Sequence, residues 1–215
     1  MSPSPTNAPN PTPLPTDPDR NALLGALRQG HLSTYTQLQL PGANLSGVIL
    51  DDQDCAQSNF AGASLAGAKL RRTSLRCILR GADLTGADLT GADLRNADGR
   101  GASFVGACCN QMSLAGAFLA GAVFSNVDLS GVDLRGADLR GATMVGCNLQ
   151  NADLSAANLS GADLSRADLE QAILVGTLFQ GANLTEANLL CAQIDRAHWE
   201  GTILNGACLE GTALG

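Results

Sequence analysis

Apolar residues recur at every fifth position along most of the chain. From Leu38 to Gly215 the sequence follows units of the form A-(D/N)-L-x-G, and we call the central residue of each unit i. The 36 units have centres at every fifth residue from 40 to 75 and again from 79 to 214, and Leu or Phe occupies 30 of them. A helix needs a period of 3.6 and a strand a period of 2, so this period predicts a compound unit.

Each unit predicts a short extended segment followed by a corner. In an extended segment side chains alternate, so positions i−2 and i point inward and the Asp or Asn at i−1 points outward. Gly at i+2 supplies the positive φ of a type II turn, most clearly in Leu40-Pro41-Gly42. Four right-angled corners close one coil, which places residue n against residue n+20. The pattern therefore predicts an all-β, quadrilateral β-helix of about nine coils over residues 38–215.

Two irregularities interrupt the pattern. One residue is missing between the centres Leu75 and Leu79, where we expect a kink or a tightened corner. Gly99 occupies a centre at which Leu is the rule, so we expect a void there or neighbours that fill it.

The segment before the repeats has a different character. Residues 1–16 hold most of the prolines among Ser, Thr and Asn, which predicts a disordered Pro-rich tail. Residues 17–37 predict a short capping α-helix and a first turn, because Asp17 suits the N-cap and Gly30 suits the C-terminal end. Its Leu residues form an apolar stripe that must lie on another element, since so short a helix is not stable alone.

Composition and charge exclude several functions. The net charge of −7 argues against direct binding to nucleic acid or to an anionic membrane, because phosphates attract clustered Lys and Arg. No long apolar stretch and no secretory signal are present, which favours the cytoplasm. Seven cysteines without a C-x-x-C pair predict neither a zinc site nor a disulfide framework, and we expect them to be small buried hydrophobes.

Candidate catalytic residues are scarce. His31 and His198 are the two groups suited to act as a base at neutral pH, and they lie near opposite ends of the predicted rod. We therefore expect no enzyme activity, no catalytic or metal site and no cofactor.

Outward-facing residues suggest three candidate surfaces. The third face, counted from Leu79, carries acidic residues without a basic one, whereas the first and fourth faces mix Arg with Asp. Outward apolar residues mark binding sites more often than polar ones do. The candidate acidic face comprises Asp88, Asp128, Asp168, Glu170 and Glu210, and the candidate partner patch comprises Val105, Phe118, Val123 and Val145.

The candidate dimer end is the last coil, with Leu204, Leu209 and Leu214. An open solenoid end exposes core and strand edges, so we expect an end-to-end homodimer there.

The run from Gly81 to Leu94, GADLTGADLTGADL, resembles the pentapeptide repeat family. This resemblance implies a right-handed quadrilateral β-helix, and the short helix before the repeats resembles the N-terminal cap of cyanobacterial members. Other members confer quinolone resistance by binding DNA gyrase as mimics of DNA. The family offers no shared catalytic residue.

The sequence thus predicts a non-enzymatic scaffold or regulatory protein that binds an unidentified protein partner through flat faces. The alternatives are a DNA-mimic inhibitor or protector of a type II topoisomerase, acting through the acidic face, a binder of small ligands, and a purely structural role.

Overall fold

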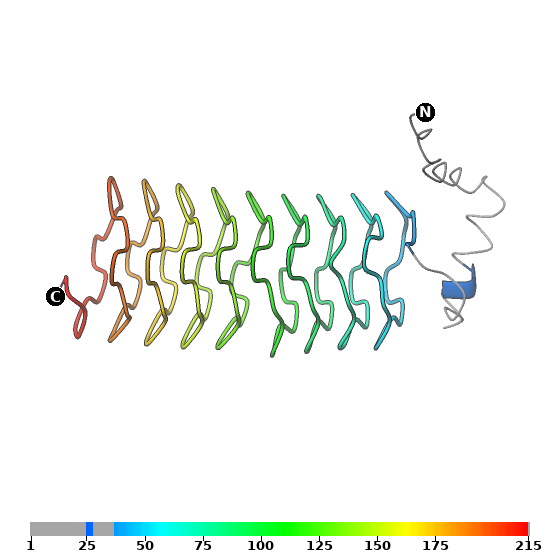
Figure 1. The fold of residues 1–215 in the computed structure, drawn as a ribbon, viewed down its shortest axis with the longest axis horizontal. Helices are drawn as coiled ribbons and strands as arrows, with labels where there is room; N and C mark the ends of the chain where they lie inside the picture. The colour runs from blue at the N-terminus through cyan, green and yellow to red at the C-terminus, as the bar shows by residue number, and fades with distance from the viewer. Residues whose placement is uncertain (1–24, 28–36, 215) are drawn as a thin grey trace, which may run out of the picture.

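The computed structural model describes residues 25–27 and 37–214. Residues 25–27 form a helical turn, and the rest of the described chain winds into coils stacked along one axis, in sequence order from one end to the other (Figure 1). Leu27, which is 1% exposed, belongs to the same hydrophobic cluster as the coil interior. The predicted tail over 1–16 and most of the predicted helix lie outside the described residues.

Neighbouring coils are joined by isolated parallel bridges between i−1 residues. In one column Gln39 bridges Asn59, and farther along Asp98 bridges Phe118, in each case 20 residues apart. Backbone hydrogen bonds run alongside, such as Leu84 N–H to the Ser103 carbonyl at 2.8 Å. An offset of four five-residue units per coil gives the solenoid four sides, as the period predicts.

The corners are type II turns. In a regular corner the N–H of the fourth residue donates to the carbonyl of the first, as Ala82 does to Leu79 at 2.9 Å. The third residue has positive φ, for example +65° at Gly42, whereas the second does not, and this combination defines type II. Fourteen described residues other than Gly also have positive φ. Thirteen of them occupy position i+2 of a unit, and the other, Gln37, precedes the first unit. Gly is therefore favoured at position i+2 but not required.

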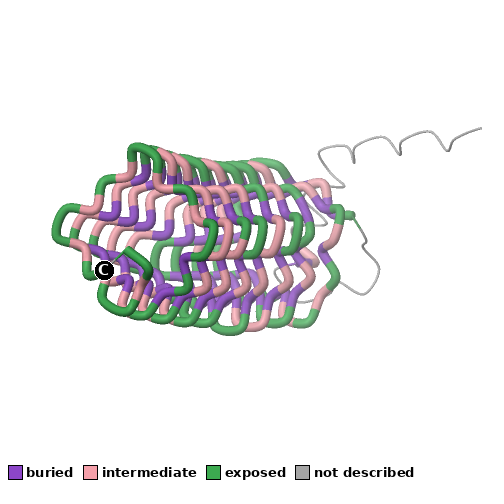
Figure 2. Tube along the Cα trace, turned by 60° about the vertical axis from the view of Figure 1, so that its left-hand side comes forward, coloured by how far each residue is buried: buried purple, intermediate pink, exposed green. Residues whose placement is uncertain are grey.

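The interior is a narrow shaft filled by the i and i−2 side chains. Leu84 and Leu89 are fully buried, and most i−2 positions hold buried Ala. Figure 2 shows buried residues along the sides of each coil and exposed residues at the corners. Two aromatic pairs stack one coil apart, Phe104 on Phe124 at 4.5 Å and Phe179 on Trp199 at 4.6 Å between ring centroids.

The missing residue near Leu75 produces a tightened corner, as expected. Cys77 N–H donates to the Leu75 carbonyl at 2.7 Å, a bond between residues two apart that is typical of a γ-turn. The bridge offset falls to 19 residues across this corner, from Asn59 to Ile78, and returns to 20 afterwards. The four columns therefore continue without interruption.

Candidate functional site

The Asp and Asn residues at i−1 stabilise the corners. The side-chain oxygen accepts a hydrogen bond from the backbone N–H two residues later, as Asp128 does from Ser130 at 3.0 Å. Sixteen described residues make this contact: Asn44, Asp54, Asn59, Asp83, Asp88, Asp93, Asp128, Asp133, Asp138, Asn148, Asp153, Asn158, Asp163, Asp168, Asn183 and Asn188. Much of the acidic character of the chain thus has a structural origin.

The candidate acidic face is less accessible than the sequence suggests. Asp88 is only 6% exposed and is paired with Arg71 from the preceding coil, so it does not belong to the accessible surface. Asp168 is half-buried and accepts hydrogen bonds from the amides of Gln150 and Asn188. The remaining members differ in exposure: Asp128 and Glu210 are exposed, and Glu170 is half-buried.

Phe118 is the most exposed residue of the candidate partner patch. Its exposure is 49%, and that of Val105 is 38%, whereas Val123 and Val145 are half-buried. Phe118 bridges Asp98 on one side and Asp138 on the other. An aromatic ring therefore lies in a column where both neighbours are carboxylates.

Other exposed apolar residues escaped the sequence analysis. Ile49, Ile78 and Ile203 all occupy outward i−1 positions and are well exposed. Their signal was available, because each replaces the usual Asp or Asn of the repeat.

Four Asp–Arg pairs surround Phe118 on the coils before and after it. In each pair the Arg at i+1 donates two hydrogen bonds to the Asp at i−1 of the same unit, at 2.7 to 2.9 Å. The pairs are Arg95 with Asp93, Arg100 with Asp98, Arg135 with Asp133, and Arg140 with Asp138. The sequence predicts that these faces mix Arg with Asp, but the repeat pattern does not indicate which partner of each pair is covered.

The pairing shifts the ionisation of both groups. The hydrogen bond from Arg100 lowers the pKa of Asp98 to about 2, with Arg80 contributing further. The pKa values of Asp93, Asp133 and Asp138 are also lowered, mainly by the hydrogen bond from the paired Arg. These carboxylates are therefore ionised at neutral pH.

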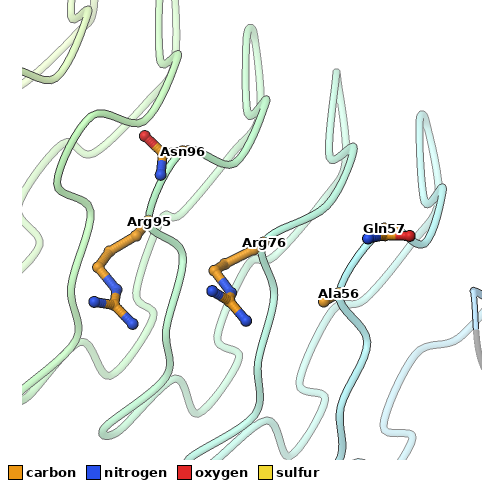
Figure 3. Close-up of a pocket in the computed structure, with 5 residues that line it drawn as sticks. All are labelled: Ala56, Gln57, Arg76, Arg95 and Asn96. Atoms are coloured by element: carbon orange, nitrogen blue, oxygen red, sulfur yellow. The ribbon is translucent and has the colours of Figure 1, made fainter.

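A notch of about 270 Å³ opens on the corner shortened by the missing residue. It is lined by Ala56, Gln57, Arg76, Arg95 and Asn96. Figure 3 shows the side chains of Arg76 and Arg95 projecting to the same side from successive coils. The lining supplies cations and amides, without a nucleophile or a base, so the notch does not have the chemistry of an active site.

The cysteines divide into two classes, which corrects the expectation that all are buried. Cys55, Cys77, Cys109 and Cys147 are buried, and burial raises the pKa of each thiol, to about 12 for Cys55. The three others, Cys108, Cys191 and Cys208, are exposed. Cys108 and Cys208 take an outward i−1 position and Cys191 a corner, so their places in the repeat gave the signal.

The described residues bring together no catalytic or metal-binding cluster. His198 is exposed and is the last residue of the i−1 column that contains Phe118. His31 lies outside the described part of the chain. Within residues 25–27 and 37–214, no three His, Cys, Asp or Glu side chains gather to hold a metal ion. The same ranges contain no helix long and apolar enough to cross a bilayer.

The candidate dimer end is partly open. Leu204 and Leu209 are only partly buried although they occupy centres, and Leu214 is exposed. Trp199 covers part of this end by stacking on Phe179.

Comparison with known proteins places this geometry in a family. The pentapeptide repeat model matches in eight copies over residues 39–76, 77–108, 109–141, 133–171 and 162–198. No curated protein matches the chain.

Several solved structures are similar. HetL from Nostoc sp. strain PCC 7120, a pentapeptide repeat protein involved in heterocyst differentiation regulation, is 28% identical over 89% of this chain and 96% of its own, with a TM-score of 0.47. QnrB1, a plasmid-mediated fluoroquinolone resistance protein, is 22% identical over 81% of this chain and 74% of its own, with a TM-score of 0.44. Rfr23 from the cyanobacterium Cyanothece 51142 is 21% identical over 78% of this chain and 88% of its own, with a TM-score of 0.22. On the match of the repeat model to most of its length, the chain belongs to the pentapeptide repeat family, whose known structures are right-handed β-helices.

Proposed function

We propose that this protein is a non-enzymatic scaffold or regulatory protein that binds a protein partner through the faces of its solenoid. The observation that carries the proposal is the half-exposed ring of Phe118, which replaces the usual Asp or Asn. A large exposed aromatic side chain is costly in water and is enriched at protein interfaces. Val105 and Val123, on the next face, are partly exposed as well and complete the candidate partner patch in this proposal.

The architecture supports a binding role. Each coil contributes a few outward side chains to a continuous wall, and stacked repeats hold these side chains in a fixed arrangement. A rigid surface loses little conformational freedom when a partner binds. We also propose that the rod has about nine coils and that a helix around residues 25–27 closes its N-terminal end. We place the action of the protein in the cytoplasm as part of this proposal.

The test compares partners captured from the native host by the wild-type protein and by two variants. Phe118→Asp places a charge in the patch, and Ile49→Asp places the same charge on another exposed i−1 residue, near the N-terminal end of the rod. We expect a specific protein to be lost with Phe118→Asp and retained with Ile49→Asp. Identical captured proteins in all three samples would show that the patch is not the contact.

A second candidate function is mimicry of DNA toward a type II topoisomerase. It is favoured by the third face, which carries the exposed Asp128 and Glu210 and has no Lys or Arg beyond Leu79. Micromolar protein would then inhibit supercoiling by gyrase, and Asp128→Asn combined with Glu210→Gln would weaken the inhibition. Unchanged supercoiling would dismiss this candidate.

We also propose an end-to-end homodimer through the last coil. Its support is the partial exposure of Leu204, Leu209 and Leu214, which a second copy would cover. Equilibrium sedimentation well above micromolar concentration tests the dimer, and a monomeric mass there would contradict it.

A further inference from the structure

Four arginines lie on the two coils that neighbour the coil of Phe118. Arg95 and Arg100 lie on the coil before it, and Arg135 and Arg140 lie on the coil after it. We call these four residues the arginine frame. Coils in a ladder are about 4.8 Å apart, so the two sides of the frame are separated by about 10 Å along the rod.

The coil that carries Phe118 has alanine at the two positions where its neighbouring coils carry arginine. Ala115 stands between Arg95 and Arg135, because Asn96 N–H bonds to the Ala115 carbonyl and Gly116 N–H bonds to the Arg135 carbonyl. Ala120 stands in the same way between Arg100 and Arg140. On the coil of Phe118, two alanines therefore stand at the positions where the neighbouring coils carry the four arginines.

The accessible charge of the frame is positive, although each Arg has an Asp partner. The side chains of the four arginines are 49 to 60% exposed, whereas those of their aspartates are 16 to 30% exposed. A molecule that approaches this surface therefore meets more of the arginine side chains than of the aspartate side chains. On a chain with a net charge of −7, this cationic surface is local.

The arginines are held in place while most of their donors remain free. A guanidinium group has five N–H donors, and each Asp takes two of them, so three remain for an external acceptor. The bidentate bond also fixes the side chain, which lowers the entropy lost when the arginine binds a ligand. Such a fork matches the planar geometry of a carboxylate.

We propose that the arginine frame and Phe118 together bind an acidic segment of a protein partner. The segment places carboxylates on guanidinium groups at both sides of the frame and an apolar side chain on the ring. Side chains of an extended chain alternate between two sides, so acidic and apolar side chains reach the surface together when they are two positions apart. The segment therefore carries two acidic residues four positions apart, which span about 13 Å of backbone, with an apolar residue midway between them. This inference rests on the proposed function and adds the chemistry of the partner.

A nucleic acid fits the surface less well. Its affinity depends on many Lys and Arg contacts to phosphates, and the aspartates and glutamates elsewhere on the rod oppose a long polyanion. A short acidic segment needs only the few guanidinium groups that the frame offers.

Fluorescence anisotropy with labelled peptides tests the proposal on the full chain. The probe is an acidic peptide with glutamates four positions apart and a phenylalanine midway between them, and its controls are a peptide with glutamines for the glutamates and one with serine for the phenylalanine. A labelled single-stranded DNA of similar charge tests the other class of ligand. We expect the acidic peptide to bind at least tenfold more tightly than either control peptide, and the DNA to bind more weakly than the acidic peptide.

Variants locate the binding. Arg100→Gln with Arg140→Gln removes one column of the frame, Phe118→Ser removes the ring, and Arg166→Gln is the matched control because Arg166 is an exposed, ion-paired arginine outside the frame. We expect the first two to weaken peptide binding at least tenfold and the control to weaken it less than twofold. Circular dichroism confirms that each variant is folded, and Arg100→Lys with Arg140→Lys, which keeps the charge without the fork, gives an intermediate loss.

Three results would overturn the inference: no binding of the acidic peptide, equal weakening by Arg166→Gln, or tighter binding of the DNA. If Phe118→Asp still removes a captured partner from the host extract, the proposed function stands and only the acidic chemistry of the partner is wrong. If the peptide binds as expected but no captured protein depends on Phe118, the site is an acidic-ligand site and the proposed function fails.

Discussion

The Cδ2 methyl carbon of Leu119 lies 3.0 Å from the position that a Cβ on Gly99 would occupy. Gly99 is the centre where the repeat calls for Leu, and Leu119 is the centre one coil farther on. The side chain of the next coil thus fills the space that the missing side chain would leave. Gly99 and Leu119 share one site in the core.

Replacing Gly99 tests this sharing. Gly99→Leu restores the repeat, but it forces two leucines into space for one, and we expect it to lower the free energy of unfolding by about 1–3 kcal/mol. Gly99→Ala needs only a small shift of Leu119, and the reduced freedom of the unfolded chain offsets this cost, so we expect a change below about 1 kcal/mol. Urea unfolding measures both. A stabilising Gly99→Leu would mean that the space is empty.

Restoring the missing residue tests the shortened corner. A Gly inserted between Arg76 and Cys77 allows a regular type II turn, which returns a backbone donor to the Arg95 carbonyl as Gly81 gives one to Arg100. We expect the free energy of unfolding to change by less than about 1 kcal/mol. The control is a Gly inserted between Gly86 and Ala87, where the corner is already regular, and it should cost at least about 2 kcal/mol. Equal losses at both sites would contradict the γ-turn.

The corner bond predicts a difference between two substitutions of Asp128. Asp128→Asn keeps an oxygen that accepts from Ser130 N–H, whereas Asp128→Ala leaves this N–H without its partner. We expect the alanine variant to lose about 1 kcal/mol of stability and the asparagine variant to lose much less. Thermal unfolding at neutral pH compares them. Equal losses would indicate that the charge, and not the hydrogen bond, is what stabilises the corner.

The Asp98 pairs predict a loss of stability in acid. The folded pKa of Asp98 is about 2 and its ordinary value is 3.8, so its contribution is complete above pH 4 and disappears as the pH falls through 2. The partner Arg100 is about half exposed, so we expect the contribution to be no more than about 1 kcal/mol. The difference in unfolding free energy between wild type and Asp98→Asn should therefore shrink between pH 4 and pH 2. A constant difference would show that the pairs add nothing.

Thiol reactivity tests the two classes of cysteine. In the native protein we expect a thiol reagent to modify Cys108, Cys191 and Cys208 within minutes, and to modify the four buried cysteines only after unfolding. The reagent cannot reach the buried thiols in the folded protein, and their raised pKa leaves little of the reactive thiolate form. Mass spectrometry of the labelled peptides identifies each site. Early labelling of Cys109 or Cys147 would mean that the shaft opens.

The main features of the fold could be predicted because the repeat acts locally. A five-residue period fixes which side chains enter the shaft and where the corners fall, and the 20-residue bridge offset follows from four corners. The tightened corner after Leu75 was predicted for the same reason. Each of these features depends on residues that are neighbours in the sequence.

Contacts between coils were harder to predict. The burial of Asp88 depends on Arg71, which reaches it from the stacked unit of the preceding coil. The exposure of the frame arginines over their aspartates depends on how each side chain lies on the wall. The period predicts whether a side chain points inward or outward, but not which neighbouring residues it reaches along the surface. The accessibility of the acidic face was therefore overestimated, and the cationic surface around Phe118 was missed.

The shortened corner at Leu75 has a consequence for how such a chain can change in length. The corner there is one residue shorter than a regular corner, yet the columns on both sides keep their order, because a γ-turn bends the chain as well as a type II turn does. Deletions at corners are therefore absorbed within one coil, whereas deletions in a wall would exchange the inward and outward sides of every unit that follows. Surfaces such as the one around Phe118 can persist while residues are gained or lost at corners elsewhere on the rod.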